Sequence, residues 1–411
     1  MTTRLRLRPQ SVLFAVYLGA LAALPPISID MALPALVDIA NSLHASASQA
    51  GLTLSLFMAG FAFGPIVYGP LSDAHGRKPT LLLGLALFTA GGVVSALAPG
   101  MGVLLGARLV QGAGAGAGMT VALAVVRDLF EGNAMQRRLA AITVVANVAP
   151  IVAPSVGVAL LAAVQWRGIY GVVAVCGLLA AVATWKGLEE SAPSRSEDFV
   201  ATGLRQQYWR VLTHRPVIGS ILINGFGFGW MFAYVAGSPL VLLHVLHIKP
   251  AVYAAMFATT GLGIVAGATV NGLVASRGVG SRCILAVAIG VTLAATVGLG
   301  VLNALHLASL LTIMPLLVAC TFCFGLAAPS ATRGALDPVP ELAGVAGGLL
   351  TSVQMLCGAA SSSLVAMLFA RVGPQAMSSV MFACALLGAL VWIWLGESPR
   401  VAVGSGSASS F

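Results

Sequence analysis

Apolar residues of this chain form long uninterrupted runs of about 20 residues or more, with short polar clusters between them. A helix needs about 20 apolar residues to cross a bilayer, and a barrel strand needs about half as many. Because lipid offers no hydrogen bonds, a spanning segment must be a helix or part of a closed barrel. Charged residues make up only 8% of the chain, whereas a soluble domain carries about 25%. The sequence therefore predicts an all-α membrane protein.

The runs predict twelve transmembrane helices. They cover residues 12–37, 50–70, 80–98, 102–126, 139–164, 168–186, 217–243, 251–275, 283–304, 308–329, 342–370 and 376–395. The polar stretch 187–215 is the longest charge-bearing segment and divides the runs six and six. We therefore expect a first bundle in residues 1–190, a cytoplasmic central loop in 191–215, a second bundle in 216–400 and a disordered Gly/Ser-rich tail in 401–411.

Lys and Arg are distributed unevenly among the polar segments. Arg167, Lys249 and Arg371 lie in segments that would face outward, and Arg108 lies within a run, whereas all the others lie in the remaining loops and near the two ends. Because basic loops stay on the cytoplasmic side, this pattern predicts that both termini are cytoplasmic. The net charge of +9 then needs no nucleic-acid partner to explain it. We expect a monomer in the lipid bilayer of a bacterial inner membrane.

Asp30 is the only acid within an apolar run, and Arg108 is the only base clearly inside one. A membrane chain that excludes charge so thoroughly keeps such groups for a function. Burial favours the neutral form of a carboxyl group, so Asp30 is expected to take a proton from outside and release it inside. The alternative is a polar helix end at the outer interface, just before Pro34. The apolar stretch 31–37 favours a deeper position.

The segment between the second and third runs reads Gly69-Pro-Leu-Ser-Asp73-Ala-His-Gly76-Arg77-Lys78. Gly76 permits a tight turn, and Asp73 is expected to accept backbone donors at a helix N-terminus. Arg77 and Lys78 can pair with acids on a neighbouring helix end, where Asp128 offers one. The segment resembles the signature loop of the major facilitator superfamily, G-x-L-x-D-x-x-G-R-K/R. The resemblance implies that these residues control a conformational change.

Three further segments resemble the Bcr/CflA-type drug-resistance transporters of that superfamily. They are Asp30-Met-Ala-Leu-Pro-Ala in the first run, Arg108-Leu-Val-Gln111-Gly in the fourth and Ala-Pro150-x-x-Ala-Pro154-x-x-Gly157 in the fifth. The resemblance covers nearly the whole chain. It implies a major facilitator fold of two pseudo-symmetric six-helix bundles, acting as a drug:proton antiporter without a cofactor. The chain departs from the pattern in its lone Gly157, in Ala22 where some exporters have a second acid, and in Ala275 where the second-half copy of the loop lacks its acid.

The resemblance also implies roles for residues of the fourth and fifth runs. Arg108 would face the central cavity and bias the proton on Asp30, although a position about 9 Å into its run also lets it snorkel to the surface. Pro150 and Pro154 should bend the fifth span. That bend would seal the cavity against proton leak, and a plain kinked helix is the alternative.

Two further patterns concern packing and ligand contact. The fourth run carries glycines at small spacing, which predicts close approach of its helix to neighbours in lipid.

The seventh run carries an aromatic and Met-rich stripe, which suits varied apolar ligands. The predicted substrate contacts are Asn224, Phe228, Met231, Tyr234 and Gln111. Ordinary helix packing is the alternative for the stripe.

The energy source follows from what the chain lacks. It contains no ATP-binding loop GxxxxGK[ST], so an ion gradient must drive it. The predicted function is export of small hydrophobic drugs by alternating access, coupled to proton entry. A proton symporter importing a nutrient and an exporter of a sugar or amino acid are alternatives. An enzyme or receptor is not expected, since no catalytic cluster is visible, and Cys320-Thr-Phe-Cys323 is only half a zinc site, so no metal is expected.

Overall fold

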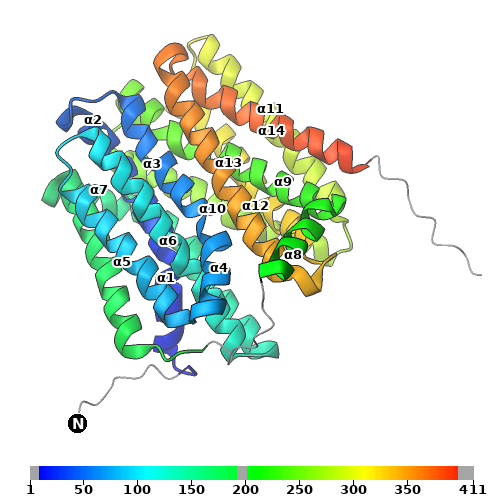
Figure 1. Cartoon of the computed structure of the whole chain (residues 1–411). Coiled ribbons are helices and arrows are strands. Elements are labelled where there is room, and N and C mark those ends of the chain that lie inside the picture. The colour runs from blue at the N-terminus through cyan, green and yellow to red at the C-terminus, as the bar shows by residue number, and fades with distance from the viewer. Residues whose placement is uncertain (1–8, 192–200, 397–411) are drawn as a thin grey trace, which may run out of the picture.

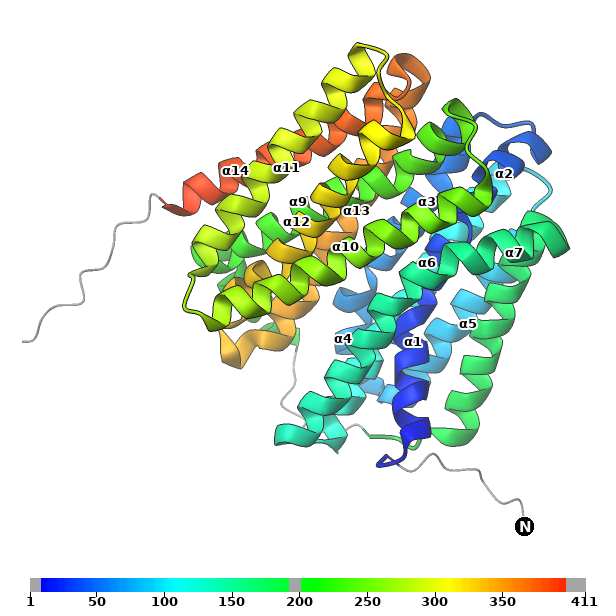
Figure 2. The ribbon, with the colours of Figure 1, turned by 180° about the vertical axis from the view of Figure 1, so that it is seen from behind.

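The computed structural model describes residues 9–191 and 201–396. These residues form helices and short connections, with no strand among them. Eleven helical segments in the described ranges are long and apolar enough to cross a membrane. The longest, α7 (Gly132–Gly187), joins two helices across a kink at Gln165, where φ is 58°. With its two limbs (Figure 2) taken as separate helices, the described residues form twelve candidate membrane spans, and the predicted all-α membrane fold is confirmed.

The first half contains six spans. The first span comprises α1 (Val12–Asp30), the short helix η1 (Leu33–Ala35) and α2 (Leu36–Ser42), and the second comprises α3 (Ala47–Ala62) and α4 (Gly64–His75). The third and fourth are α5 (Arg77–Ala96) and α6 (Met101–Leu129), and the limbs of α7 complete the set.

The second half begins with α8 (Ala201–Thr213), which is too short to be a span. Its six spans are α9 (Arg215–Ser238) with the π-helical turn η2 (Pro239–Val245), α10 (Pro250–Ser276), α11 (Ser281–Ala304), α12 (Leu310–Leu336), η3 (Pro340–Leu342) with α13 (Ala343–Val372), and α14 (Gln375–Gly396).

The central segment differs from the predicted loop because α8 is helical and docked. Val211 is fully buried in a cluster with Val217, Ile221, Ala335 and Leu350, so α8 is held on the second bundle. Burial of one apolar side of α8 gives it a reason to fold although it lies outside the spans. The predicted tail 401–411 lies outside the described residues.

The two bundles lie side by side, and they meet along two pairs of helices (Figure 1). Helix α3 packs on α13, and α7 packs on α10. The hydroxyl groups of Ser55 and Ser362 are 2.8 Å apart across the first seam, and the Ser48 hydroxyl donates to the carbonyl oxygen of Ala366 nearby. These contacts lie toward the end opposite the α4–α5 connection, so that end is sealed.

Glycines of α6 allow the first bundle to close tightly. A Cβ on Gly112 would overlap the carbonyl oxygen of Phe57 on α3, and one on Gly116 would overlap the backbone of Gly64. Gly114 lies equally close to the backbone of Phe88 on α5. The prediction that small residues bring this helix close to its neighbours is confirmed.

Gly112→Ala should lower the melting temperature of the protein purified in detergent, because overpacking costs about 1–3 kcal/mol. Gly106→Ala on the same helix is the control, since nothing lies within 4 Å of its added Cβ. That variant should melt at or slightly above the native temperature, as alanine favours the helix. Equal melting temperatures for the two variants would contradict the close packing.

Candidate functional site

Asp30 is the last residue of α1, at a break in the first span. The chain continues through η1, with Pro34 at its centre, into α2. The Asp30 side chain is buried, with 5% exposure for the residue. In the described part of the chain, its carboxyl group forms neither an ion pair nor a hydrogen bond. Asp30 thus lies at a helix end, as the alternative interpretation expected. Its side chain is enclosed rather than exposed at the outer interface.

The surroundings of Asp30 come from both bundles. Gly157 of α7 lies against the carbonyl oxygen of Met31, where a Cβ would overlap it. The next turn, η1, contacts α10 and η2 of the second bundle. This acid therefore sits at the sealed seam between the two halves.

Arg108 points inward from α6 and is only 1% exposed, so it does not snorkel. Its Nη1 donates to Ser28 Oγ at 2.8 Å, and its Nη2 donates to the Ser28 carbonyl oxygen at 3.1 Å. The guanidinium lies 4.3 Å from the ring centre of Phe57 and 5.3 Å from that of Tyr170. Carbonyl oxygens and aromatic faces thus take the place of an acid. Arg108 holds α1 two residues before Asp30 without pairing with it.

Gln111 is fully buried in the first bundle. Its Oε1 accepts a hydrogen bond from Arg108 Nη1 at 2.6 Å. A Cβ on Gly91 of α5 would overlap its backbone, so the two helices leave no space for a ligand there. In this conformation Gln111 positions Arg108.

Asp73 and Arg77 at the α4–α5 connection and Asp128 of α6 form a cluster of charged side chains, called the latch below. Gly76 has φ 98°, a conformation that glycine adopts without strain. The Nε of Arg77 lies 2.8 Å from Asp128 Oδ2 on α6, and its Nη1 bonds Asp73. Nη1 also donates to Ser72 Oγ at 2.7 Å. The predicted pairing of Arg77 with Asp128 is confirmed.

The prediction for Asp73 was wrong, because Asp73 lies near the C-terminal end of α4 and bonds a side chain. The backbone donors at the start of α5 bind Glu190 instead, Arg77 N at 2.7 Å and Lys78 N at 3.2 Å. Lys78 Nζ donates to the carbonyl oxygens of Trp185 and Leu188, each at 2.8 Å. Glu190 was missed because its role depends on the sixth span ending beside α5.

The fifth-span prolines lie inside the first limb of α7. Ile151, between Pro150 and Pro154, lies against Gly261 of α10 in the other bundle. This stretch therefore belongs to the seam between halves. A sealing role for the prolines stays a prediction.

The predicted ligand stripe of α9 is largely occupied by packing. The Nδ2 of Asn224 donates to the Ala328 carbonyl oxygen and to Thr332 Oγ1, both at 3.3 Å. The Tyr234 hydroxyl lies 2.8 Å from Thr260 Oγ1. Both residues are buried, with 2% exposure, and these bonds lie within the second bundle, while Asn224 Oδ1 has no hydrogen-bond partner in the described structure. A ligand contact by Asn224 or Tyr234 stays a prediction.

Phe228 and Met231 are half-buried. The Phe228 ring centre lies 4.4 Å from that of Phe232 and 6.0 Å from that of Phe324. Gly358 of α13 sits between Phe228 and Met58 of α3, so Phe228 borders the meeting of the halves. A ligand contact by Phe228 or Met231 stays a prediction.

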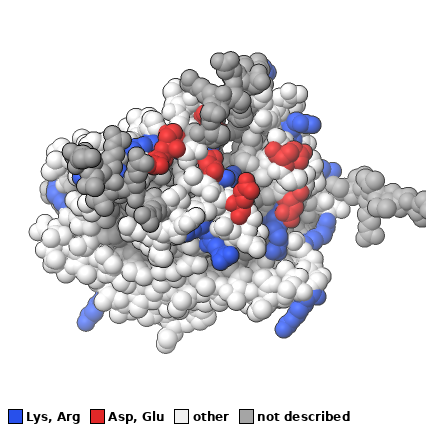
Figure 3. Space-filling view, turned by 90° about the horizontal axis from the view of Figure 1, so that it is seen from below, with Lys and Arg blue, Asp and Glu red and all other residues white. Residues whose placement is uncertain are grey.

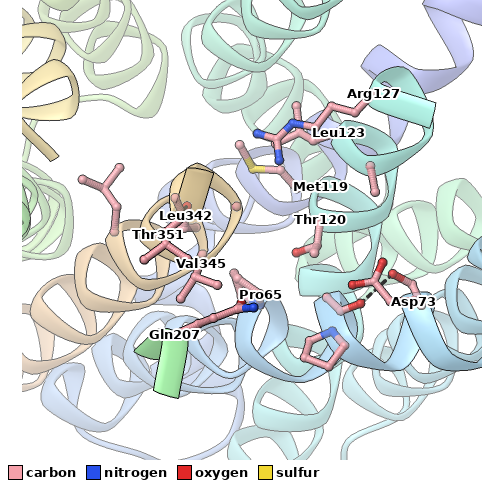
Figure 4. A pocket seen from close by; sticks show the side chains of 18 of the residues that line it. Pro65, Asp73, Met119, Thr120, Leu123, Arg127, Gln207, Leu342, Val345 and Thr351 are labelled. Carbon is pink, nitrogen blue, oxygen red and sulfur yellow. Dashed lines mark hydrogen bonds between the residues drawn. The ribbon is translucent and has the colours of Figure 1, made fainter. Parts of the chain in front are cut away.

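A cavity of about 560 Å³ opens at the latch end, between the halves. That volume suits a small drug. Figure 4 shows Leu342 of η3 and Val345 and Thr351 of α13 facing Pro65 of α4 and Thr120 of α6 across it. The remaining lining includes Gly69, Asp73, Arg77, Arg127, Asp128, Gln207, Tyr208 and Glu341, and it contains none of the predicted substrate contacts. Seen from this end, acidic and basic side chains are intermixed (Figure 3).

The second bundle has a neutral counterpart of the latch. Arg333 of α12 donates from Nη2 to Asn271 Oδ1 on α10 at 3.1 Å. Asn271 is fully buried and donates to Ser330 Oγ and the Leu326 carbonyl oxygen, both at 2.7 Å. Arg333 thus bonds an amide, whereas Arg77 of the first bundle bonds acids.

Asp128→Asn should destabilise the protein, because it removes the charge that faces Arg77. The two side chains are 12% and 9% exposed, and breaking so enclosed a pair costs about 2 kcal/mol or more. The melting temperature in detergent should fall by several degrees. Arg137→Ala removes an exposed charge of α7 and should leave it unchanged. An unchanged melting temperature for Asp128→Asn would mean that the latch adds nothing to stability.

Two six-helix bundles that enclose a cavity at their seam form the architecture of alternating-access transporters. Residues 18–362 match the model of the Major Facilitator Superfamily. The chain belongs to this superfamily, a family of transporters rather than enzymes, and is a multi-pass membrane protein.

Relatives agree with this assignment. The "Uncharacterized MFS-type transporter YdgK" of Bacillus subtilis is 32% identical, with 93% of this chain and 94% of the relative covered. The "Bicyclomycin resistance protein homolog" of Haemophilus influenzae is 28% identical, with 93% and 96% covered. The "Multidrug resistance protein MdtL" of Escherichia coli is 27% identical, with 95% and 97% covered. The resemblance to drug-resistance transporters is confirmed at this level.

Solved structures share the fold at low identity. A D-xylose-proton symporter matches with a TM-score of 0.71 and 16% identity, over 94% of this chain and 98% of the other. A bacterial homologue of the lysosomal transporter Spinster, in an inward-facing and occupied conformation, matches with a TM-score of 0.69 and 16% identity, over 94% and 96%.

Proposed function

We propose that this protein exports small hydrophobic drugs from the bacterial cytoplasm in exchange for protons. The observation that carries the proposal is Asp30, a carboxyl group enclosed at the seam of the bundles with no partner of opposite charge among the described residues. An isolated carboxyl group in a water-poor site favours its neutral form. Asp30 can therefore load a proton when the outer side is open and give it up when a drug enters from inside.

The names of the relatives favour drugs as cargo. One is a bicyclomycin resistance protein homologue and another is a multidrug resistance protein, both aligned over nearly their full length. The cavity walls contribute Phe61, Met119, Leu123 and Leu342, a surface that suits an apolar compound. Sequence identity of 27–28% supports the class of cargo and leaves the individual compound open.

Orientation follows the placement of Lys and Arg. The latch end carries the basic loops, so it faces the cytoplasm of the inner membrane with both termini. The cavity then opens to the cytoplasm, in an inward-facing state that can receive a drug. We propose that a monomer carries out the whole cycle, because each half supplies one wall of the cavity.

The proton gradient sets a limit on export. At about 2.3 kcal/mol per charge per 100 mV, a proton motive force of about 150 mV supplies about 3.5 kcal/mol per proton. For one proton per neutral drug, that supports a concentration ratio of at most a few hundred-fold, since about 1.4 kcal/mol corresponds to each factor of ten.

Asp30→Asn should abolish drug-evoked proton release, because an amide cannot carry the proton. The measurement is proton flux from acid-loaded inverted vesicles on adding bicyclomycin, chloramphenicol or a sulfonamide, beside wild type. Asp38→Asn, which changes an exposed acid of α2, is the control and should behave as wild type. Drug-evoked flux in Asp30→Asn equal to wild type would remove Asp30 from the mechanism.

The same assay separates the alternatives. Proton flux evoked by a sugar or amino acid, in the direction of import, would indicate a nutrient symporter. Flux evoked by a metabolite in the direction of export would indicate a metabolite exporter. The likeness to a D-xylose-proton symporter supports the fold alone, at 16% identity.

A further inference from the structure

Helix α8 brings two polar side chains to the wall of the cavity. Gln207 and Tyr208 line it, and both are half-buried. Val211, one turn further along α8, is fully buried against the second bundle, and α8 packs on α9 and α13. The backbone that carries Gln207 and Tyr208 is therefore held in place, although it lies outside the spans.

The orientation of α8 separates two glutamines that are adjacent in the sequence. Residues three and four apart lie on the same side of a helix, so Gln207 and Tyr208 share the inner side with Val211. Gln206 and Trp209 are exposed, and neither lines the cavity. The same amide side chain is thus present once in the cavity wall and once outside it.

The Gln207 side chain extends toward the first bundle. Figure 4 shows it directed from α8 toward Pro65 of α4, whose ring carries no group that could bond an amide. Within the described ranges, the Gln207 amide and the Tyr208 hydroxyl form no hydrogen bond. Both groups can donate and accept, so both are open to a molecule in the cavity.

The charges of the cavity wall do not select a ligand of one sign. Arg77 is bonded to Asp73 and Asp128 within the latch. Arg127 and Glu341 are exposed and of opposite charge. The charges therefore largely offset one another, which favours an uncharged ligand.

The remaining surface is mainly apolar, and one of its hydroxyl groups is already engaged. Thr351 Oγ1 donates to the Gly347 carbonyl oxygen at 3.1 Å. Phe61, Met119 and Leu350 supply apolar surface. A site of this kind holds a ligand by its apolar part and orients it through a few polar groups.

We propose that Gln207 and Tyr208 are specificity-determining residues, which hydrogen-bond the polar group of an uncharged drug while the apolar wall holds its hydrophobic part. This inference rests on the proposed function and names the class of cargo as uncharged compounds with amide, carbonyl or hydroxyl groups. A site that bonds such a group discriminates against compounds that lack it, because its own polar groups are then left unpaired. The connector between the bundles thereby takes part in choosing the cargo.

The test measures equilibrium binding of radiolabelled chloramphenicol, an uncharged compound with an amide and hydroxyl groups, to the protein purified in detergent. Gln207→Leu should weaken binding about three- to tenfold, the effect of one lost hydrogen bond. Tyr208→Phe removes only a hydroxyl group and should act in the same direction. Gln206→Leu is the matched control on the exposed side of α8 and should bind as wild type.

Drug-evoked proton flux separates ligand contact from a structural role. In inverted vesicles, Gln207→Leu should raise the KM for chloramphenicol by the same factor and leave the maximal flux unchanged, because the residue contributes to binding and carries no proton. A lower maximal flux at unchanged KM would indicate a structural role and overturn the inference.

Equal affinities of Gln207→Leu, Tyr208→Phe and Gln206→Leu for chloramphenicol would also overturn it. If wild type still shows drug-evoked flux in that case, the proposed function stands and only the role of α8 is removed. Wild-type protein that binds neither chloramphenicol, bicyclomycin nor a sulfonamide would overturn the inference together with the proposed cargo.

Discussion

A bilayer interior contains no water to satisfy a polar group, and this constraint accounts for most of the polar contacts inside the spans. The buried guanidinium of Arg108 is satisfied because it donates to Ser28 and Gln111 and lies over an aromatic ring. The buried amide of Asn271 donates hydrogen bonds to the Leu326 carbonyl oxygen and to Ser330 Oγ. Asp30 is different, because in the described structure its carboxyl group has no such partner. Within the described spans, this buried acid without a partner is placed where the bundles meet.

The two ends of the molecule are held by different chemistry. The sealed end is closed by small residues, hydroxyl groups and backbone carbonyls, as in the contacts of Ser48 and Ser55 with α13. The latch end is held within the first bundle by ions, with Arg77 between Asp73 and Asp128. Neutral contacts at a seam are individually weak, so the bundles can separate there. Ion pairs within one bundle add to the rigidity of that bundle.

Much of this architecture could be predicted from the sequence, because the signals are local. The length of the apolar runs gives the spans, and the exclusion of charge singles out Asp30 and Arg108. The loop signature predicts the pairing of Arg77 with Asp128. The side of each helix that points into the bundle could not be predicted. A helix in lipid is apolar on all sides, so its periodicity does not mark the inner side. Gln111, Asn224 and Tyr234 were expected to contact a ligand. In this structure Gln111 Oε1, Asn224 Nδ2 and the Tyr234 hydroxyl bond neighbouring residues, and their ligand contacts stay predictions. Glu190 and α8 depend on contacts between distant segments, which no local pattern records.

The connector between the bundles has an additional consequence. Helix α8 is fixed to the second bundle through Val211, and its residues Gln207 and Tyr208 form part of the cavity wall. The connector thus lines the cavity in addition to linking the two bundles. A hybrid transporter assembled from the bundles of two relatives would inherit one wall segment from whichever parent supplied the join. The choice of crossover point would then alter what the cavity admits, even with every span left intact.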